Sequence, residues 1–361
     1  MSYQEITTVN HPVSETVVSK GRIFWIDFLK LISIAAMIML HIAAVGMTKY
    51  KAGSINWEIS NAFDSICRFC VPVFVMISGA VFLNRSKEIR IFKYVKRICI
   101  SLLFWSIAYS LFAESLNILA GNITILQFCV SIVSPTYLWF LYMIAGIYLI
   151  IPLLKPIIGN RATERYFIIL WVIFSILIPA VDEIDCINKF LKPMLAQIDI
   201  RLILGYSGYF VLGHYLYNET RKINKMMLVF LMVLAIAITY FGTSLISRGM
   251  AYGVSELFYG YFFPTTFVTS CCIFLLFKEI EWDKICVAGR IRNLITTLAE
   301  ISLGIYAIHM FFVMGFAKVG LFTINQYAIL TLPFLEIVIF LISSCIAIFI
   351  KKVIHYGNNI V

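Results

Sequence analysis

The first long apolar stretch of the chain, residues 22–46, carries three side chains that could take part in chemistry: Asp27, Lys30 and His41. Lys30 follows Asp27 by three residues and His41 follows Lys30 by eleven, so all three fall near one stripe of a helix. Ionisable groups inside a membrane helix are energetically costly and mark candidate functional sites. Asp27 and Lys30 alone could instead form an ion pair that snorkels to the membrane interface. His41, at the far end of the same stripe, favours a functional role.

Composition identifies the class of protein that positions these residues. Of the 361 residues, 61% are hydrophobic and only 13% are charged, which is typical of an all-α, polytopic integral membrane protein. About 20 apolar residues at ~1.5 Å each are needed to cross the ~30 Å hydrocarbon core. The apolar stretch 122–134 is too short for this and is expected to lie in the interface or to re-enter the membrane. We predict about ten transmembrane helices, at residues 23–46, 63–83, 97–117, 136–154, 166–181, 200–217, 226–247, 257–277, 294–317 and 329–350.

The distribution of basic residues predicts the orientation in the bilayer. The net charge of +10 comes mostly from short loops between apolar runs, which favours a topological cause over a nucleic-acid partner. Loops on the side of the N-terminus hold twenty lysines and arginines and the opposite loops hold six, which places both termini in the cytoplasm. The chain then divides into a polar cytoplasmic tail (residues 1–20), a membrane-embedded domain (21–352) and a cytoplasmic C-terminal tail (353–361).

With this topology, four side chains from four predicted helices lie at similar depth toward the outer face. They are His41, Arg68, Trp139 and His309, whereas Lys30 belongs to the inner half. The sequence therefore predicts a pathway with a cytoplasmic entrance and a chemical site toward the outside.

Other chemistries find little support in the sequence. Cys67 and Cys70 form a C-x-x-C pair on a predicted helix, but no second pair follows, so we interpret them as small buried residues. We find no zinc-ligand spacing, glycine-rich phosphate loop or serine-nucleophile motif, and we expect no metal site.

Residues from five predicted helices form a pattern that is typical of one protein family. They are Asp27, Lys30 and His41 in the first helix; Arg68, Pro72, Phe74, Ser78 and Gly79 in the second; Trp139, Phe140, Tyr148 and Pro152 in the fourth; residues 205–216 (GYSGYFVLGHYL) in the sixth; and Ser302, Tyr306 and His309 in the ninth. In these elements the chain resembles acyltransferase family 3, the bacterial integral-membrane O-acyltransferases. The resemblance runs in family order across nearly the whole chain.

One element departs from the family pattern. After the second helix the family often carries Arg-x-x-Arg, thought to help hold the phosphates of the acyl-CoA donor. Here Arg97 stands at the second position and Tyr94 at the first, with Lys93 and Lys96 nearby. Lysine can neutralise a phosphate as a point charge but lacks the bidentate geometry of arginine. This loop would also be basic under the positive-inside rule alone.

The resemblance implies transfer of an acetyl or similar short acyl group from cytoplasmic acyl-CoA to a hydroxyl of a cell-surface polysaccharide or lipid-linked glycan. The protein would be a multi-pass protein of the bacterial inner membrane, with acetyl-CoA as donor and no permanently bound cofactor. A neutral imidazole suits the base that such a hydroxyl needs, so His41 is the first candidate, as base or as transient acyl carrier. His309 could be its partner or orient it. Arg68 could stabilise the oxyanion or bind the acceptor, or simply snorkel.

Two further groups of residues are candidates for substrate contacts. The donor would be held by Lys30, Lys93, Lys96 and Arg97, and the acceptor by Asp27, Trp139, Tyr306 and Glu256. Glu256 could equally belong to a solvated outer loop, and Tyr306 could simply pack one turn from His309.

A different class of protein shares some of these features. A secondary transporter or flippase would also show many helices, intramembrane charges and a polar pathway. However, the sequence contains no internal repeat and no pair of helices broken at equivalent positions, which favours the enzyme.

Overall fold

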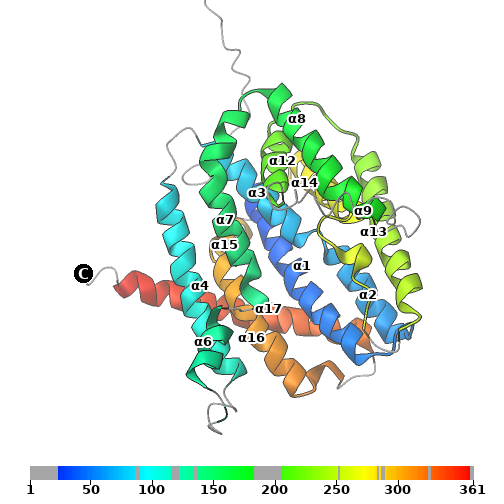
Figure 1. Ribbon diagram of the computed structural model, residues 1–361, viewed down its shortest axis with the longest axis vertical. Helices are drawn as coiled ribbons and strands as arrows, with labels where there is room; N and C mark the ends of the chain where they lie inside the picture. The colour runs from blue at the N-terminus through cyan, green and yellow to red at the C-terminus, as the bar shows by residue number, and fades with distance from the viewer. Residues whose placement is uncertain are drawn as a thin grey trace, which may run out of the picture.

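The computed structural model describes residues 23–85, 90–114, 122, 124–133, 136–182, 205–250, 253–282, 284–285, 289–323 and 327–357. The N-terminal tail expected over residues 1–20 lies outside these ranges. Within them, the chain forms helices and no strand, which confirms the all-α class (Figure 1).

Eight helices of the described chain are long and apolar enough to cross a membrane, where the sequence led us to expect about ten. A ninth span would come from α15 (Gly289–Glu300) and α16 (Ser302–Lys318), which are bent by 72° relative to each other. The expected sixth span is represented by α12 (Ser207–Tyr217), whose eleven residues are too short alone. The eight are α1 (Phe24–Lys49), α2 with α3 (Ile55–Cys67 and Cys70–Leu83), α4 (Ile91–Ala113), α7 (Trp139–Leu154) continued by η2 (Lys155–Ile157), α8 (Arg161–Trp171) continued by η3 (Val172–Leu177) and α9 (Ile178–Asp182), α13 (Lys225–Ser247), η4 (Leu257–Tyr259) with α14 (Pro264–Glu279), and α17 (Ala328–Gly357).

The second span begins earlier than the hydrophobic pattern indicated. We expected it at residue 63, but α2 starts at Ile55, where the side chain of Ser54 accepts a hydrogen bond from the backbone N–H of Trp57. The first turns of α2 are rich in polar residues, which hides them from a hydropathy window. Many of these side chains are buried and bonded inside the protein; Asn61, for example, donates to the carbonyl of Tyr240. The short stretch near residue 122 forms α6 (Ile125–Val133), nine residues long.

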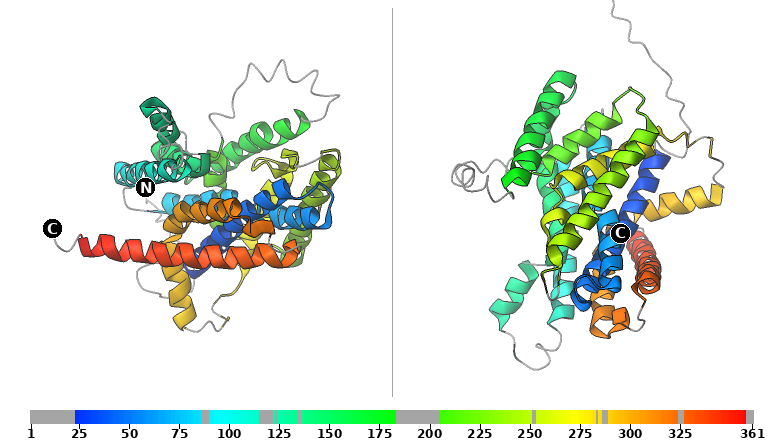
Figure 2. Two further views of the ribbon diagram at one scale, coloured as in Figure 1. Left: turned by 90° about the horizontal axis from the view of Figure 1, so that it is seen from below. Right: turned by 90° about the vertical axis from the view of Figure 1, so that its right-hand side faces the viewer.

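Helix α1 lies at the centre of the bundle (Figure 1). It contacts α2, α3, α14, α15, α16 and α17. Helices α4, α6 and α7 form a layer on one side, and the long helix α17 crosses on the opposite side (Figure 2). The candidate residues of α1 are therefore surrounded by protein over most of the length of the helix.

Helices α3 and α12 cross at very short range, and two glycines permit it. A Cβ on Gly79 would lie 1.8 Å from the carbonyl oxygen of Phe210, and one on Gly213 would lie 2.0 Å from the carbonyl oxygen of Met76. Small residues at a crossing let two membrane helices approach closely enough for their backbones to pack. Both glycines belong to the elements that resemble acyltransferase family 3, so part of this resemblance reflects helix packing and not chemistry.

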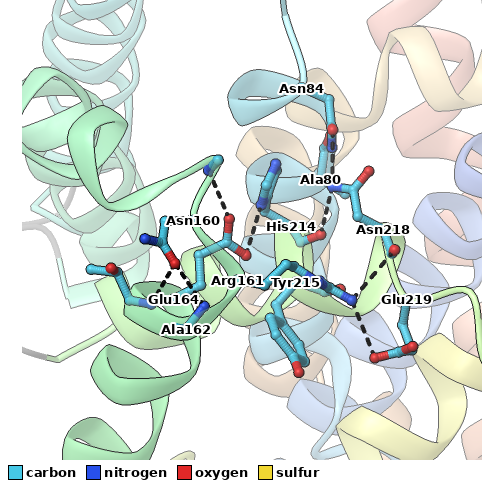
Figure 3. Close-up of polar contacts among 12 residues, drawn as sticks. Ala80, Asn84, Asn160, Arg161, Ala162, Glu164, His214, Tyr215, Asn218 and Glu219 are labelled. Carbon is cyan, nitrogen blue, oxygen red and sulfur yellow. Dashed lines mark hydrogen bonds and ion pairs between the residues drawn. The ribbon is translucent and has the colours of Figure 1, made fainter. Parts of the chain in front are cut away.

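A polar cluster ties the ends of α8 and α12 together, away from α1 (Figure 3). The Nη1 group of Arg161 donates to the carbonyl of Tyr215 at 2.9 Å, and its Nη2 group donates to the carboxylate of Glu219 at 3.2 Å. The buried side chains of Glu164 and His214 face each other with 3.5 Å between Oε2 and Nδ1. This cluster connects the start of α8 to the end of α12, the helix that packs against α3.

Candidate active site

A cavity of about 310 Å³ runs along α1. Its wall on this helix consists of Lys30, Ile34, Met37 and His41, which follow one another at spacings of four, three and four residues. This is the stripe that the helical period placed on one face. Asp27, expected on the same stripe, is buried below Lys30 and is not among the lining residues.

The two ends of the cavity can be assigned from the helices that face α1. Phe82 and Tyr148 line the end near Lys30, with their ring centroids 4.6 Å apart. The other end is lined by His41 and Trp139, the first residue of α7. The charged lining residues Lys30, Arg97 and Glu300 belong to the first end, whereas aromatic side chains line both ends.

His41 faces a second histidine from a distant part of the chain. The rings of His41 and His309 have centroids 5.3 Å apart and are tilted by 39°. His309 is completely buried, and its Nδ1 lies 2.6 Å from the carbonyl oxygen of Tyr306. A carbonyl oxygen can only accept, so this contact assigns the proton of a neutral His309 to Nδ1 and leaves a lone pair on Nε2. Within the described chain, Nε2 has no hydrogen-bond partner.

The bend between α15 and α16 shapes the wall opposite α1. Glu300 is the last residue of α15 and Ser302 the first of α16, and both line the cavity together with Tyr306. Tyr306 donates its hydroxyl proton to the carbonyl of Tyr137 at 2.8 Å and so holds the segment that precedes α7. The carboxylate of Glu300 is paired with Lys351 at 2.6 Å.

Only one of the three basic residues expected on α4 reaches the cavity. All three are exposed, and Arg97 lines the cavity whereas Lys93 and Lys96 do not. Tyr94, which stands where the family often has arginine, also lines the cavity, and its hydroxyl accepts a hydrogen bond from Nη1 of Arg85 at 2.7 Å. Arg85 therefore lies beside Tyr94, the position where the family motif often has its first arginine. Arg85 precedes α4 and belongs to no motif, so its sequence context did not indicate this role.

Arg68, a catalytic candidate on sequence grounds, lies at the junction of α2 and α3 and is not among the lining residues. Its guanidinium is engaged by both carboxylate oxygens of Asp64, one of them at 2.8 Å from Nη2. Nη1 donates to the carbonyl of Tyr259 at 3.2 Å, and the guanidinium lies 3.9 Å from the centroid of that ring. The Asp64 side chain is completely buried. The spacing of four residues between Asp64 and Arg68 is the signal that could have revealed the pair.

The structure does not place all of the residues expected to contact the acceptor in one site. Trp139 and Tyr306 line the cavity, whereas Glu256 is exposed, at the residue before η4, and does not. Tyr261, which belongs to no recognisable motif, lines the cavity near Trp139. Across the described residues, no group of three histidine, cysteine or acidic side chains is placed to hold a metal ion.

Comparison with known proteins gives one match. Residues 23–353 match a family model that is described as an acyltransferase domain. No curated protein and no solved structure matches the chain.

Proposed function

Since the chain belongs to acyltransferase family 3, with residues 23–353 matched, we propose that this membrane acyltransferase acts on sugars. In this proposal it moves an acetyl or similar short acyl group from acyl-CoA to a hydroxyl of a cell-surface polysaccharide or lipid-linked glycan. The donor enters from the cytoplasm, and the protein resides in the bacterial inner membrane. The family favours this enzyme class over a transporter.

The observation that carries the proposal is the cavity that joins Lys30 to His41. Eleven residues separate them on one helix, so they lie ~16 Å apart at helical rise. This distance is comparable to the length of a pantetheine arm. A donor whose nucleotide stays at the Lys30 end can therefore present its thioester at His41, inside the membrane.

The charges at the Lys30 end suit the anionic part of the donor. Lys30 and Arg97 line this end, and Arg85 is held beside it by Tyr94. Arginine binds phosphate oxygens through a planar fork of donors, and its charge acts strongly where water is scarce. Arg85 supplies the guanidinium for which the motif has no arginine at position 94.

The His41 end of the cavity suits the acyl transfer step. A nitrogen of neutral His41 takes the proton from the acceptor hydroxyl while its oxygen attacks the thioester carbonyl carbon. A C–O bond forms, and the C–S bond then breaks as the tetrahedral intermediate collapses. The proton passes from His41 to the departing thiolate, so the products are an ester and free CoA. No redox step or metal is needed.

His309 is a positioning residue in this scheme. Its Nδ1–H is committed to the carbonyl of Tyr306, which leaves Nε2 as an acceptor in a ring that packs beside His41. A proton donated by one nitrogen of His41 to this acceptor would leave the other nitrogen of His41 unprotonated, as a general base must be. We assign Arg68 to the support of this site, because its donors are directed at Asp64 and Tyr259.

The experiment that tests the proposed function uses isolated membranes. Membranes containing wild type, His41→Ala or His214→Ala are incubated with acetyl-labelled CoA and the glycan fraction of the source cells. His214 is a buried histidine outside the cavity and serves as the matched control. We expect label in the glycan with wild type and His214→Ala, and none with His41→Ala. Absence of transfer with wild type, for acetyl and succinyl donors alike, would refute the proposal, and equal transfer with His41→Ala would refute the role of His41.

A further inference from the structure

Three aromatic side chains from distant segments converge at the His41 end of the cavity. Trp139 begins α7, Tyr206 directly precedes α12, and Tyr261 lies between η4 and α14. The ring of Trp139 lies 5.8 Å from that of Tyr261 and 5.9 Å from that of Tyr206, centroid to centroid, with tilts of 31° and 38°. Trp139 and Tyr261 line the cavity.

These rings differ from the belt of aromatic residues found at membrane interfaces. Belt residues face lipid and headgroups, whereas Trp139 and Tyr261 border the same cavity as His41. Trp139 retains 36% of its surface exposed although Tyr206, Phe140 and Tyr261 surround it. Because Trp139 lines the cavity, the part of its ring that borders the cavity is a surface that a ligand can cover.

The backbone around Tyr261 is held in place. Its carbonyl accepts a hydrogen bond from the hydroxyl of Tyr209 at 2.6 Å, and Tyr209 is completely buried. In contrast, the hydroxyl of Tyr261 makes no hydrogen bond among the described residues, and the side chain lines the cavity. The side chain thus offers a fixed ring with an available polar tip.

We infer that Trp139 and Tyr261 form an aromatic wall that binds the acceptor sugar ring, with the Tyr261 hydroxyl bonded to one of its hydroxyl groups. A sugar ring presents C–H groups on one face and hydroxyls around its edge, which matches an aromatic surface with one polar tip. The lining residues Trp139 and Tyr261 themselves carry no charge, which suits a neutral sugar ring. The inference rests on the proposed function and adds to it the residues that hold the acceptor against His41.

The test uses the full-length protein in lipid nanodiscs and oligosaccharides released from the surface polysaccharide of the source cells. Calorimetry measures their binding to wild type, Trp139→Leu, Tyr261→Leu and Tyr261→Phe, and acyl transfer gives the donor and acceptor KM of the same samples. Tyr166→Leu is the matched control, because Tyr166 is an exposed tyrosine of α8 outside the cavity. His41→Ala separates binding from catalysis.

We expect the two leucine variants to bind the oligosaccharides about tenfold more weakly, since each loses a stacked ring. Tyr261→Phe loses one hydrogen bond and should bind about threefold more weakly. The donor KM should stay within about twofold in all of them, a change too small to involve a donor contact. Tyr166→Leu should bind as wild type does, whereas His41→Ala should lose acyl transfer. If a leucine variant does not elute as a monodisperse peak, Trp139→Phe and Tyr261→Phe carry the test.

The outcomes distinguish a failure of the aromatic wall from a failure of the proposed function. Wild type that binds no oligosaccharide, or leucine variants that bind as tightly as wild type, would overturn the wall. Acyl transfer with an acceptor KM that the wall variants do not change would also overturn it and would leave the proposed function standing. Binding that depends on Trp139 and Tyr261 without any acyl transfer by wild type would support the wall and refute the proposed function.

Discussion

The imidazole rings of His41 and His309 face each other across the junction of α1 and α16, with centroids 5.3 Å apart. The chain carries five histidines in all. Because the carbonyl of Tyr306 engages Nδ1 of His309, the pair is asymmetric: His309 offers an acceptor, and His41 borders the cavity. In the proposed function, this asymmetry favours His41 as the reacting residue and His309 as the residue that orients it.

Replacement of His309 should separate orientation from proton transfer. His309→Ala removes the acceptor and should lower kcat by about 100-fold, the lower range for loss of general-base catalysis. The side-chain carbonyl of His309→Gln can accept a hydrogen bond near the position of Nε2 and should recover kcat to within about tenfold of wild type. Both are measured with labelled acetyl-CoA at saturating donor and acceptor. Equal losses in the two variants would contradict an orienting role.

The charged end of the cavity predicts which basic residues affect the donor. Lys30→Gln and Arg97→Gln should each raise the KM for acyl-CoA by about tenfold, the loss of one charge-assisted contact of about 1.4 kcal/mol. Lys93→Gln removes an exposed charge outside the cavity and should change this KM by less than about twofold. Steady-state assays at varied donor and fixed acceptor measure the three values. A change of the same size in Lys93→Gln would mean that the loop acts only through its overall charge.

The wall of α1 was the most predictable part of the site. The helical period alone places Lys30, Ile34, Met37 and His41 on one face, and the structure shows these four lining the cavity. The all-α membrane class follows as directly from composition. Two of the ten expected spans differ in detail: the ninth is bent by 72° at Ile301, which hydropathy does not show, and residues 200–204 of the sixth lie outside the described residues.

Contacts between distant segments could not be derived in the same way. Nothing local to Tyr261 indicates that its ring meets Trp139, and nothing local to Arg85 indicates that it bonds Tyr94. Arg68 illustrates a different difficulty. A charged residue in an apolar stretch suggested chemistry, whereas the structure pairs it with Asp64, which lies one turn earlier in the same predicted span.

The Arg85–Tyr94 contact can be tested as a unit. Tyr94→Phe removes the hydroxyl that accepts a hydrogen bond from Arg85. We expect it to raise the acyl-CoA KM by about threefold, the effect of losing one hydrogen bond that positions the guanidinium. Arg85→Gln should raise it by about tenfold. If Tyr94 acts through Arg85, the double variant should show no more than the Arg85→Gln effect, because the two changes are not independent. Additive effects in this double-mutant cycle would indicate separate roles.

The polar cluster at the ends of α8 and α12 predicts a response to acid. The backbone N–H of Arg221, together with the Arg161 guanidinium, holds the pKa of Glu219 below its ordinary value of about 4.5. The folded state therefore binds fewer protons than the unfolded state near this pH, so this contribution to stability is present above pH ~4.5 and lost below it. We expect Glu219→Gln to lower the Tm in detergent at pH 7, with the difference from wild type shrinking toward pH 4. A difference that does not depend on pH would contradict this account.

The buried Arg68–Asp64 pair predicts a loss of stability that a second substitution repairs. Arg68→Met should lower the stability by about 3–5 kcal/mol, because the completely buried carboxylate of Asp64 would lose its partner. The double variant Arg68→Met, Asp64→Leu buries no charge and should regain most of the lost Tm. Thermal unfolding in detergent measures both, and the transfer assay measures kcat on the same preparations.

The double variant also decides what Arg68 does for the reaction. If Arg68 only supports the α2–α3 junction, a stable double variant should keep the kcat of wild type to within about tenfold, well short of the 10²–10³-fold loss expected when an oxyanion donor is removed. A stable double variant that has lost 100-fold or more would return Arg68 to the reaction itself. Arg68 would then have to leave Asp64 or Tyr259 to reach the acyl group, because in this structure neither its bonds nor its position direct it into the cavity.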